Sequence, residues 1–69
     1  MEKLIKYTKL NFKPSKQYMY VKDIDKLVDE AQEWMLEMID HFNFPSNELD
    51  LDLFRKEMTD WFLMINYNG

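Results

Sequence analysis

The chain has 69 residues, of which 46% are hydrophobic and 16% aromatic, and its formal net charge is −4. A chain of this length fits one compact domain with a small core, so residues 1–69 are treated as a single domain. It has no cysteine, which excludes a disulfide framework and a thiolate metal site. No apolar segment approaches the roughly 18 residues that a membrane span requires, so we expect a cytoplasmic protein without a membrane-inserted segment.

Charge is divided unevenly along the sequence. Residues 1–22 contain six lysines and a single acidic residue, Glu2, which gives a formal charge of +5. Residues 23–69 contain twelve acidic and three basic residues, which gives −9. This asymmetry predicts a molecule with a basic part and an acidic part.

The N-terminal part of the sequence is predicted to form a β-hairpin with strands over residues 3–12 and 17–22. The first segment is rich in aromatic and β-branched residues, and a turn with proline and serine separates it from the second. The alternation is imperfect, because Ile5 and Tyr7 fall on one face of the first strand whereas Leu10 and Phe12 fall on the other. We therefore expect a bulge in this strand or a cover on both of its faces.

The strongest periodic pattern predicts a helix over residues 23–42. Asp23 is a suitable N-cap, and acidic residues occupy the face opposite the apolar one. Pro45 ends the pattern, because the residue before a proline is pushed out of the α region. The apolar positions, spaced by three and four, are Ile24, Leu27, Val28, Ala31, Trp34, Met35, Met38, Ile39 and Phe42.

A second helix, antiparallel to the first, is predicted over residues 47–65, with Ser46 or Asn47 as its cap. This helix has two apolar stripes on different sides, and one contact with the first helix cannot bury both. The second stripe therefore needs the hairpin or another copy of the chain as a cover. We assign it to self-association, and its members are Leu49, Leu53, Leu63 and Met64.

The fold class that follows is α+β, with the order ββαα. Apolar residues also alternate strictly over residues 61–67, a pattern that is typical of a strand. A third, C-terminal strand is therefore the alternative to the end of the second helix. Such a strand would support the hairpin, which is marginally stable alone.

Residues typical of catalysis are scarce in this sequence. It has one histidine, no cysteine and a single glycine, so a catalytic thiol and a glycine-rich phosphate loop are both absent. Glu33, Glu37 and His41 have the i, i+4, i+8 spacing of a metal site, but this spacing is common on the solvated face of an acidic helix. We expect no enzymatic activity, no catalytic or metal-binding residue, and no cofactor.

Two acidic motifs in the first predicted helix, Glu30-x-x-Glu33 and Glu37-x-x-Asp40, resemble in outline those of the all-α nucleoside triphosphate pyrophosphohydrolases. In that family, carboxylates from two separate helices hold Mg²⁺, whereas both motifs here lie in one predicted helix. A single helix would scatter the metal ligands around its circumference. The resemblance therefore implies no site residue for this chain.

An acidic stripe in the same helix is a candidate partner-binding surface. Asp29, Glu33, Glu37 and Asp40 lie near one line, at about one helical turn per step, which approaches the phosphate spacing of a nucleic-acid strand. Leu36 interrupts this acidic face and is a candidate apolar contact. Small acidic proteins that imitate DNA, often encoded by bacteriophages, bind basic grooves in this way. The alternative is an ordinary solvated helix face.

A third candidate surface is formed by Lys6, Lys9, Tyr18 and Tyr20 on the predicted hairpin. Lysines that neutralise phosphates and aromatic rings that stack on bases are typical of single-stranded nucleic-acid binding. Lysines on an edge strand also prevent aggregation, and an acidic protein repels a polyanion. Nucleic acid is therefore not the expected partner.

The sequence favours a non-enzymatic interaction module that forms a homodimer and regulates or inhibits a larger partner protein. The basis is the second apolar stripe, together with basic and acidic parts that can pair across a dimer. The alternative is an acidic inhibitor that occupies the basic groove of a nucleic-acid-binding protein.

Overall fold

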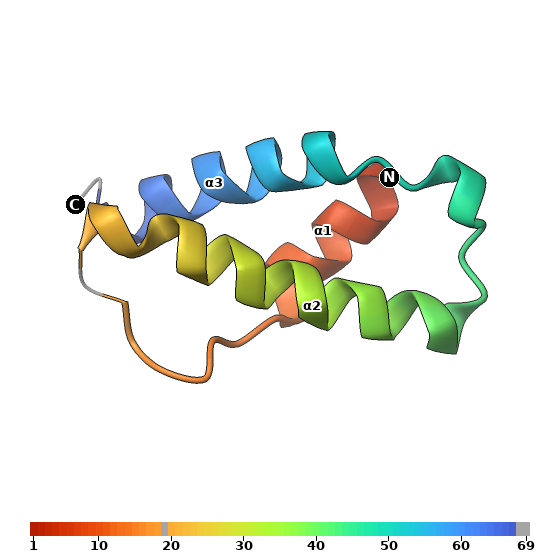
Figure 1. Ribbon diagram of the computed structural model, residues 1–69, viewed down its shortest axis with the longest axis horizontal. Coiled ribbons are helices and arrows are strands. Elements are labelled where there is room, and N and C mark those ends of the chain that lie inside the picture. The colour runs from red at the N-terminus through yellow and green to blue at the C-terminus, as the bar shows by residue number, and fades with distance from the viewer. Residues whose placement is uncertain (19, 68–69) are drawn as a thin grey trace.

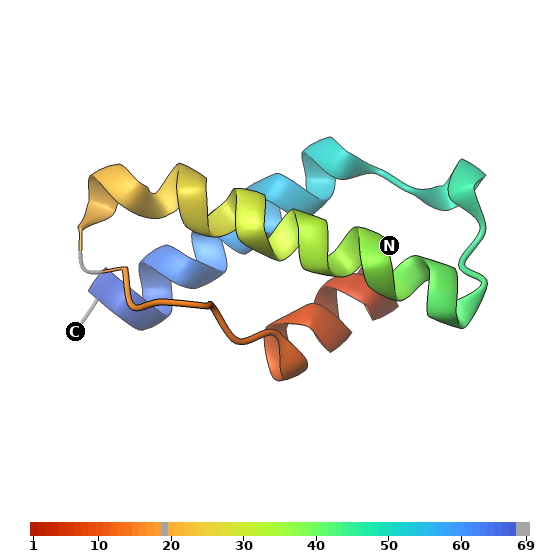
Figure 2. The same ribbon diagram turned by 60° about the horizontal axis from the view of Figure 1, so that its bottom comes forward.

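The computed structural model describes residues 1–18 and 20–67, without the side chains of residues 66 and 67. The described chain folds into three α-helices: α1 (Glu2–Asn11), α2 (Ile24–Phe42) and α3 (Leu51–Tyr67). The 3-10 turns η1 (Val21–Asp23) and η2 (Ser46–Glu48) precede α2 and α3. The helices α2 and α3 lie antiparallel, and the short α1 packs against both (Figures 1 and 2).

The predicted α+β fold class is wrong, because residues 1–18 and 20–67 contain no β-strand. The first predicted strand, residues 3–12, lies almost entirely in α1. The second, residues 17–22, forms an irregular segment that leads into η1, and Met19 within it lies outside the described residues. The alternative strand over residues 61–67 is also wrong, because α3 continues to Tyr67.

Residue Thr8 shows how a residue that favours strands is accommodated in the N-terminal helix. Thr8 is fully buried, and its hydroxyl donates a hydrogen bond of 2.8 Å to the carbonyl oxygen of Leu4, one turn earlier. With its hydroxyl satisfied inside the helix, Thr8 packs like an apolar residue. Leu4, Ile5 and Thr8, with Phe12 just beyond, form a buried stripe of helical spacing. The helix ends at Phe12, which is extended.

The helix predicted over residues 23–42 is confirmed as α2. It ends where Asn43 adopts the left-handed conformation with φ of 53° and donates its backbone N–H to the carbonyl oxygen of Ile39. Asparagine tolerates this conformation better than most residues, and Pro45 then prevents the helix from continuing.

The second predicted helix is confirmed as α3, but its start differs from the prediction. Ser46 and Asn47 lie in η2, and Leu49 is extended. Asp50 caps α3 instead, because its Oδ1 accepts a hydrogen bond of 3.0 Å from the backbone N–H of Leu53.

The hydrophobic core lies where the three helices meet. Phe12 contacts both long helices. Its ring centroid lies 5.8 Å from that of Trp34 on α2 and 6.2 Å from that of Phe62 on α3. Burial of one large apolar side chain contributes about 1.5–3 kcal/mol. The buried apolar residues are Leu4, Ile5, Phe12, Leu27, Val28, Ala31, Met35, Phe54, Met58 and Phe62.

Among the described helices, none has both the length and the apolar character that crossing a lipid bilayer requires.

Candidate protein-interaction site

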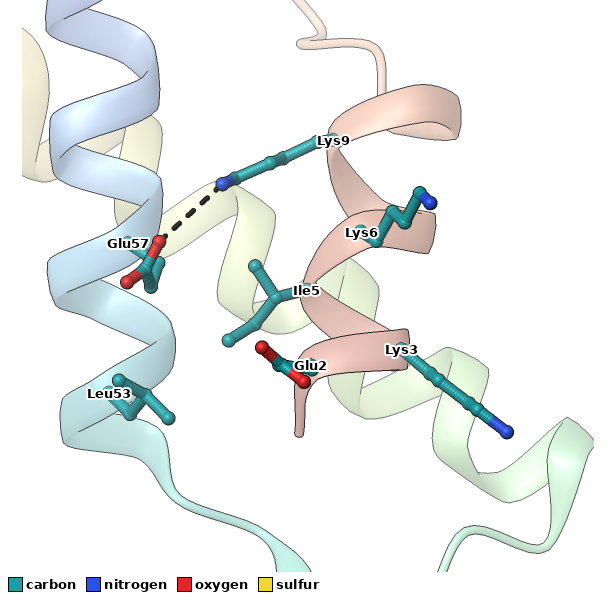
Figure 3. Close-up of a pocket in the computed structure, with 7 residues that line it drawn as sticks. All are labelled: Glu2, Lys3, Ile5, Lys6, Lys9, Leu53 and Glu57. Atoms are coloured by element: carbon teal, nitrogen blue, oxygen red, sulfur yellow. Dashed lines mark ion pairs between the residues drawn. The ribbon is translucent and has the colours of Figure 1, made fainter.

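A groove of about 570 Å³ runs between α1 and α3, with α2 behind it (Figure 3). Ile5 and Leu53 point toward each other across the groove and form its apolar part. Charged side chains surround these two residues. The complete lining is Glu2, Lys3, Ile5, Lys6, Lys9, Leu53 and Glu57.

Lys9 closes one end of the groove. Its Nζ lies 3.5 Å from Oε2 of Glu57 and 5.4 Å from the centre of the Trp61 ring, so it joins α1 to α3 through an ion pair and a cation–π contact. Both partners of the ion pair are partly exposed, so the pair itself contributes at most about 1 kcal/mol. Its main effect is to fix the two walls of the groove relative to each other.

Lys3 and Lys6 have a different orientation. Both side chains point away from α3 (Figure 3), and neither forms an ion pair within the described part of the chain. Both residues are exposed. They therefore form a basic rim on the α1 side of the groove.

The α3 side carries an apolar and acidic line. Leu53, Glu57, Asp60 and Met64 follow one another at i, i+4, i+7 and i+11, a spacing that places them on one side of the helix. Leu53 is 38% exposed and Met64 is 51% exposed. Two apolar side chains thus flank two carboxylates on the surface beside the groove.

The predicted self-association stripe is divided by the structure. Leu53 and Met64 are exposed on the line just described. Leu49 lies before α3, partly buried against the core, and Leu63 is half-buried on another side of α3. Only two of the four predicted residues therefore share an open surface.

The predicted acidic stripe on α2 is also modified. The carboxylate of Asp29 lies 2.7 Å from Nη2 of Arg55, which joins α2 to α3. Leu36 is half-buried and packs against the core rather than standing free among carboxylates. Glu33, Glu37 and Asp40 remain exposed on α2. Asp29 is exposed as well, so all four carboxylates of the predicted stripe reach the surface, and one of them is paired with Arg55.

The four residues predicted for nucleic-acid binding are not brought together. Lys6 and Lys9 lie on α1, where Lys9 faces Glu57. Tyr18 and Tyr20 lie in the segment before α2 and line a separate depression of about 280 Å³. The platform that a hairpin would have formed is lost because α1 is helical.

Glu30 fixes the segment between α1 and α2. Its carboxylate accepts hydrogen bonds from the backbone N–H of Ser15 and from the hydroxyl of Tyr18, the latter at 2.9 Å. Partial burial acts to raise the pKa of Glu30, but the hydrogen bonds from Ser15 and Tyr18, helped by the charge of Lys16, lower it below its ordinary value of 4.5. The hydrogen bond to Glu30 raises the pKa of Tyr18 above 10.0, with desolvation and nearby carboxylates acting in the same direction.

Four residues that line the groove, Glu2, Lys3, Ile5 and Glu57, were not among the candidate site residues identified from the sequence, and Lys6 and Lys9 were assigned to a different surface. Glu2, Ile5 and Lys9 lie at i, i+3 and i+7, the spacing of one helix side, and this signal was available. Their juxtaposition with Leu53 and Glu57 depends on tertiary packing, for which the sequence carries no comparable pattern.

Within residues 1–18 and 20–67, no group of three or more His, Asp or Glu side chains is placed to hold a metal ion. The groove instead combines an apolar centre, formed by Ile5 and Leu53, with charged side chains around it.

Comparison with known proteins gives no match, since no family model, curated protein or solved structure is significantly similar to this chain.

Proposed function

We propose that this chain is a non-enzymatic protein-interaction module that works as a homodimer in the cytoplasm and regulates or inhibits a larger partner protein. The observation that carries the proposal is the exposure of Leu53 and Met64 along the outward side of α3, beside a groove whose centre is also apolar. Association would remove these apolar side chains from water.

The size and charge distribution of the chain support self-association. A domain of 69 residues buries a smaller fraction of its unfolded surface than a larger domain does, and domains of this size can gain stability from a second subunit. Lysines are concentrated in α1 and the segment that follows it, whereas carboxylates are concentrated in α2 and α3. Two copies can therefore attract each other although each has a net charge of −4. The absence of cysteine suits the proposed cytoplasmic location.

Analytical ultracentrifugation at micromolar concentration tests this proposal. The wild-type chain is expected to sediment as a dimer, and Leu53→Glu is expected to shift it toward the monomer because a carboxylate would have to be desolvated in the interface. Val21→Glu is the matched control, since Val21 is 56% exposed and does not line the groove. A wild-type chain that stays monomeric and is unaffected by Leu53→Glu contradicts the proposal.

A second candidate function is binding to a basic partner through the acidic face of α2. It is favoured by the exposure of Glu33, Glu37 and Asp40 on α2, away from the groove, where dimerisation through α3 would leave them open. At a rise of about 1.5 Å per residue, successive carboxylates of this face lie about 5–6 Å apart along the helix axis, which approaches the phosphate spacing of a nucleic-acid strand. A basic groove that binds nucleic acid could therefore attract this face. This candidate predicts partner binding that weakens steeply with salt and is lost when Glu33 and Glu37 become lysine. Partner binding that changes neither with salt concentration nor with these two substitutions would contradict this second candidate function.

A further inference from the structure

We infer that two copies of this chain associate about a twofold axis through the groove face, so that α1 of each copy lies against α3 of the other. The groove face is the surface formed by Lys3, Lys6, Leu53, Glu57, Asp60 and Met64, around the groove. The inference rests on the proposed self-association and adds which surfaces meet. In this dimer, the lysines of α1 in one copy face the carboxylates of α3 in the other.

The first argument is the division of charge across the groove face. Its α1 side carries three lysines, Lys3, Lys6 and Lys9, and one carboxylate, Glu2. Its α3 side carries Glu57 and Asp60, with the exposed Lys56 nearby on the same helix. The α1 side is therefore net positive and the α3 side net negative. A twofold axis through the groove exchanges the two sides, so each basic side meets an acidic side. The surface is therefore complementary to itself, which a twofold interface requires.

The second argument is that the lysines are available. Lys3 and Lys6 point away from α3 of their own chain (Figure 3), whereas Lys9 is already engaged with Glu57 and Trp61. Asp60 is exposed and has no ion-pair partner within the described residues. Pairing Lys6 with Asp60 of another copy therefore breaks no contact inside the chain.

The third argument is the apolar surface. Leu53 lines the groove, with Ile5 across from it on α1. In the proposed dimer, Leu53 approaches Leu53 of the other copy near the twofold axis. Met64 follows eleven residues later on the same side of α3, about 16 Å away at 1.5 Å per residue and beyond Glu57 and Asp60, so it adds a second apolar contact at the end of the surface. The contact thus has an apolar centre and a charged rim, as protein interfaces do.

A head-to-tail arrangement covers the apolar part of the groove face less well. In it, the groove face of one copy would meet the acidic face of α2 in the next copy. Leu53 would then be covered by Glu33 and Glu37, which lose hydration without gaining an apolar contact. Such a contact also joins two different surfaces, so it produces rings or chains of molecules rather than a twofold dimer.

Charge-reversal variants in a mixing experiment test the inference. In a twofold dimer, Lys6→Glu alone and Asp60→Lys alone each place two like-charged pairs in the homodimer, and each is expected to raise the dissociation constant about tenfold. When the two variants are mixed, the mixed dimer contains only opposite-charged pairs and is expected to regain wild-type affinity within about threefold. Sedimentation equilibrium gives the homodimer constants, and native mass spectrometry of the mixture gives the fraction of mixed dimer.

Control variants with the same change in net charge separate a local effect from a general one. Lys22→Glu and Asp40→Lys alter exposed residues outside the groove face and are expected to leave the dissociation constant within about twofold. Circular dichroism establishes that every variant keeps the helical content of the wild type.

The outcomes distinguish this inference from the proposed function on which it rests. A wild-type chain that is monomeric at every concentration contradicts both the twofold arrangement and the proposed self-association. A dimer that is indifferent to Lys6→Glu and Asp60→Lys, or that gains nothing from mixing them, overturns the twofold arrangement and leaves self-association standing. Species larger than a dimer that dissociate on Glu33→Lys also overturn it, in favour of the head-to-tail arrangement. Preferential formation of the mixed dimer supports it.

Discussion

The guanidinium of Arg55 on α3 joins two residues of α2: its Nη2 lies 2.7 Å from Oδ1 of Asp29, and its Nη1 donates a hydrogen bond of 3.0 Å to Oε1 of Gln32. This contact connects the two long helices. The side chain of Asp29 is still 66% exposed in the ion pair. One carboxylate of the predicted acidic stripe on α2 is therefore partly neutralised by a cation of the same chain without being withdrawn from the surface.

Loss of this contact is expected to lower stability modestly. We expect Arg55→Ala to reduce the free energy of unfolding by about 0.5–1 kcal/mol, because both charged partners are partly exposed and water screens the pair. Urea denaturation followed by circular dichroism measures the change. Lys56→Ala, which removes an exposed positive charge from the neighbouring position, is the control and should cost less. Equal costs for the two variants would mean that the contact does not stabilise the packing of α2 on α3.

Phe12 and Leu10 give a test of the fold itself. In the predicted hairpin both side chains fall on one face of a strand, whereas in the helical structure Phe12 is buried and Leu10 is 69% exposed. We expect Phe12→Ala to cost about 3–5 kcal/mol, because it leaves a cavity between Trp34 and Phe62. Leu10→Ala is expected to stay within about 0.5 kcal/mol of the wild type. Thermal and urea unfolding measure both, and comparable losses for the two variants would contradict the helical assignment of α1.

The hydrogen bonds to Glu30 predict a dependence of stability on pH. Since the pKa of Glu30 is lower in the folded chain than its ordinary value of 4.5, the unfolded chain binds a proton more readily in this range. The stabilisation that ionised Glu30 gives to the folded chain is fully present above pH 4.5. It is lost as the pH falls through the lower pKa that Glu30 has in the folded chain. Glu30→Gln is therefore expected to flatten the acid limb of a plot of unfolding midpoint against pH.

Two variants make the pH experiment specific. Glu33→Gln changes an exposed carboxyl on the same helix and is expected to keep the wild-type acid limb. Tyr18→Phe removes one hydrogen-bond donor to Glu30 and is expected to raise the pKa of Glu30, giving an intermediate profile. If Glu30→Gln and Glu33→Gln have the same acid limb, the contacts of Glu30 do not stabilise the fold.

The helices α2 and α3 were predictable because their apolar spacing is long and regular. The end of α2 at Asn43 followed from the proline two residues later. The segment that forms α1 was assigned to a strand because Ile5, Tyr7 and Thr8 favour strands. Tertiary packing outweighs this preference, since Thr8 satisfies its hydroxyl within the helix and joins the buried side.

The candidate site was predictable only in part. The excess of apolar residues on α3 predicted a second stripe, of which Leu53 and Met64 are exposed. Leu49 and Leu63 share the same periodicity, but the η2 turn and the late start of α3 place them elsewhere. The groove forms because α1 lies beside the first turns of α3, a relationship between distant segments that no local pattern encodes.

Nuclear magnetic resonance over a dilution series tests the central claim, self-association through the groove face, most directly. We predict that backbone amide signals of Lys6, Leu53, Asp60 and Met64 shift together as the concentration rises, with one dissociation constant, while those of Glu33 and Glu37 on the opposite side stay unchanged. Signals that are all independent of concentration, or shifts confined to Glu33 and Glu37, would contradict the account.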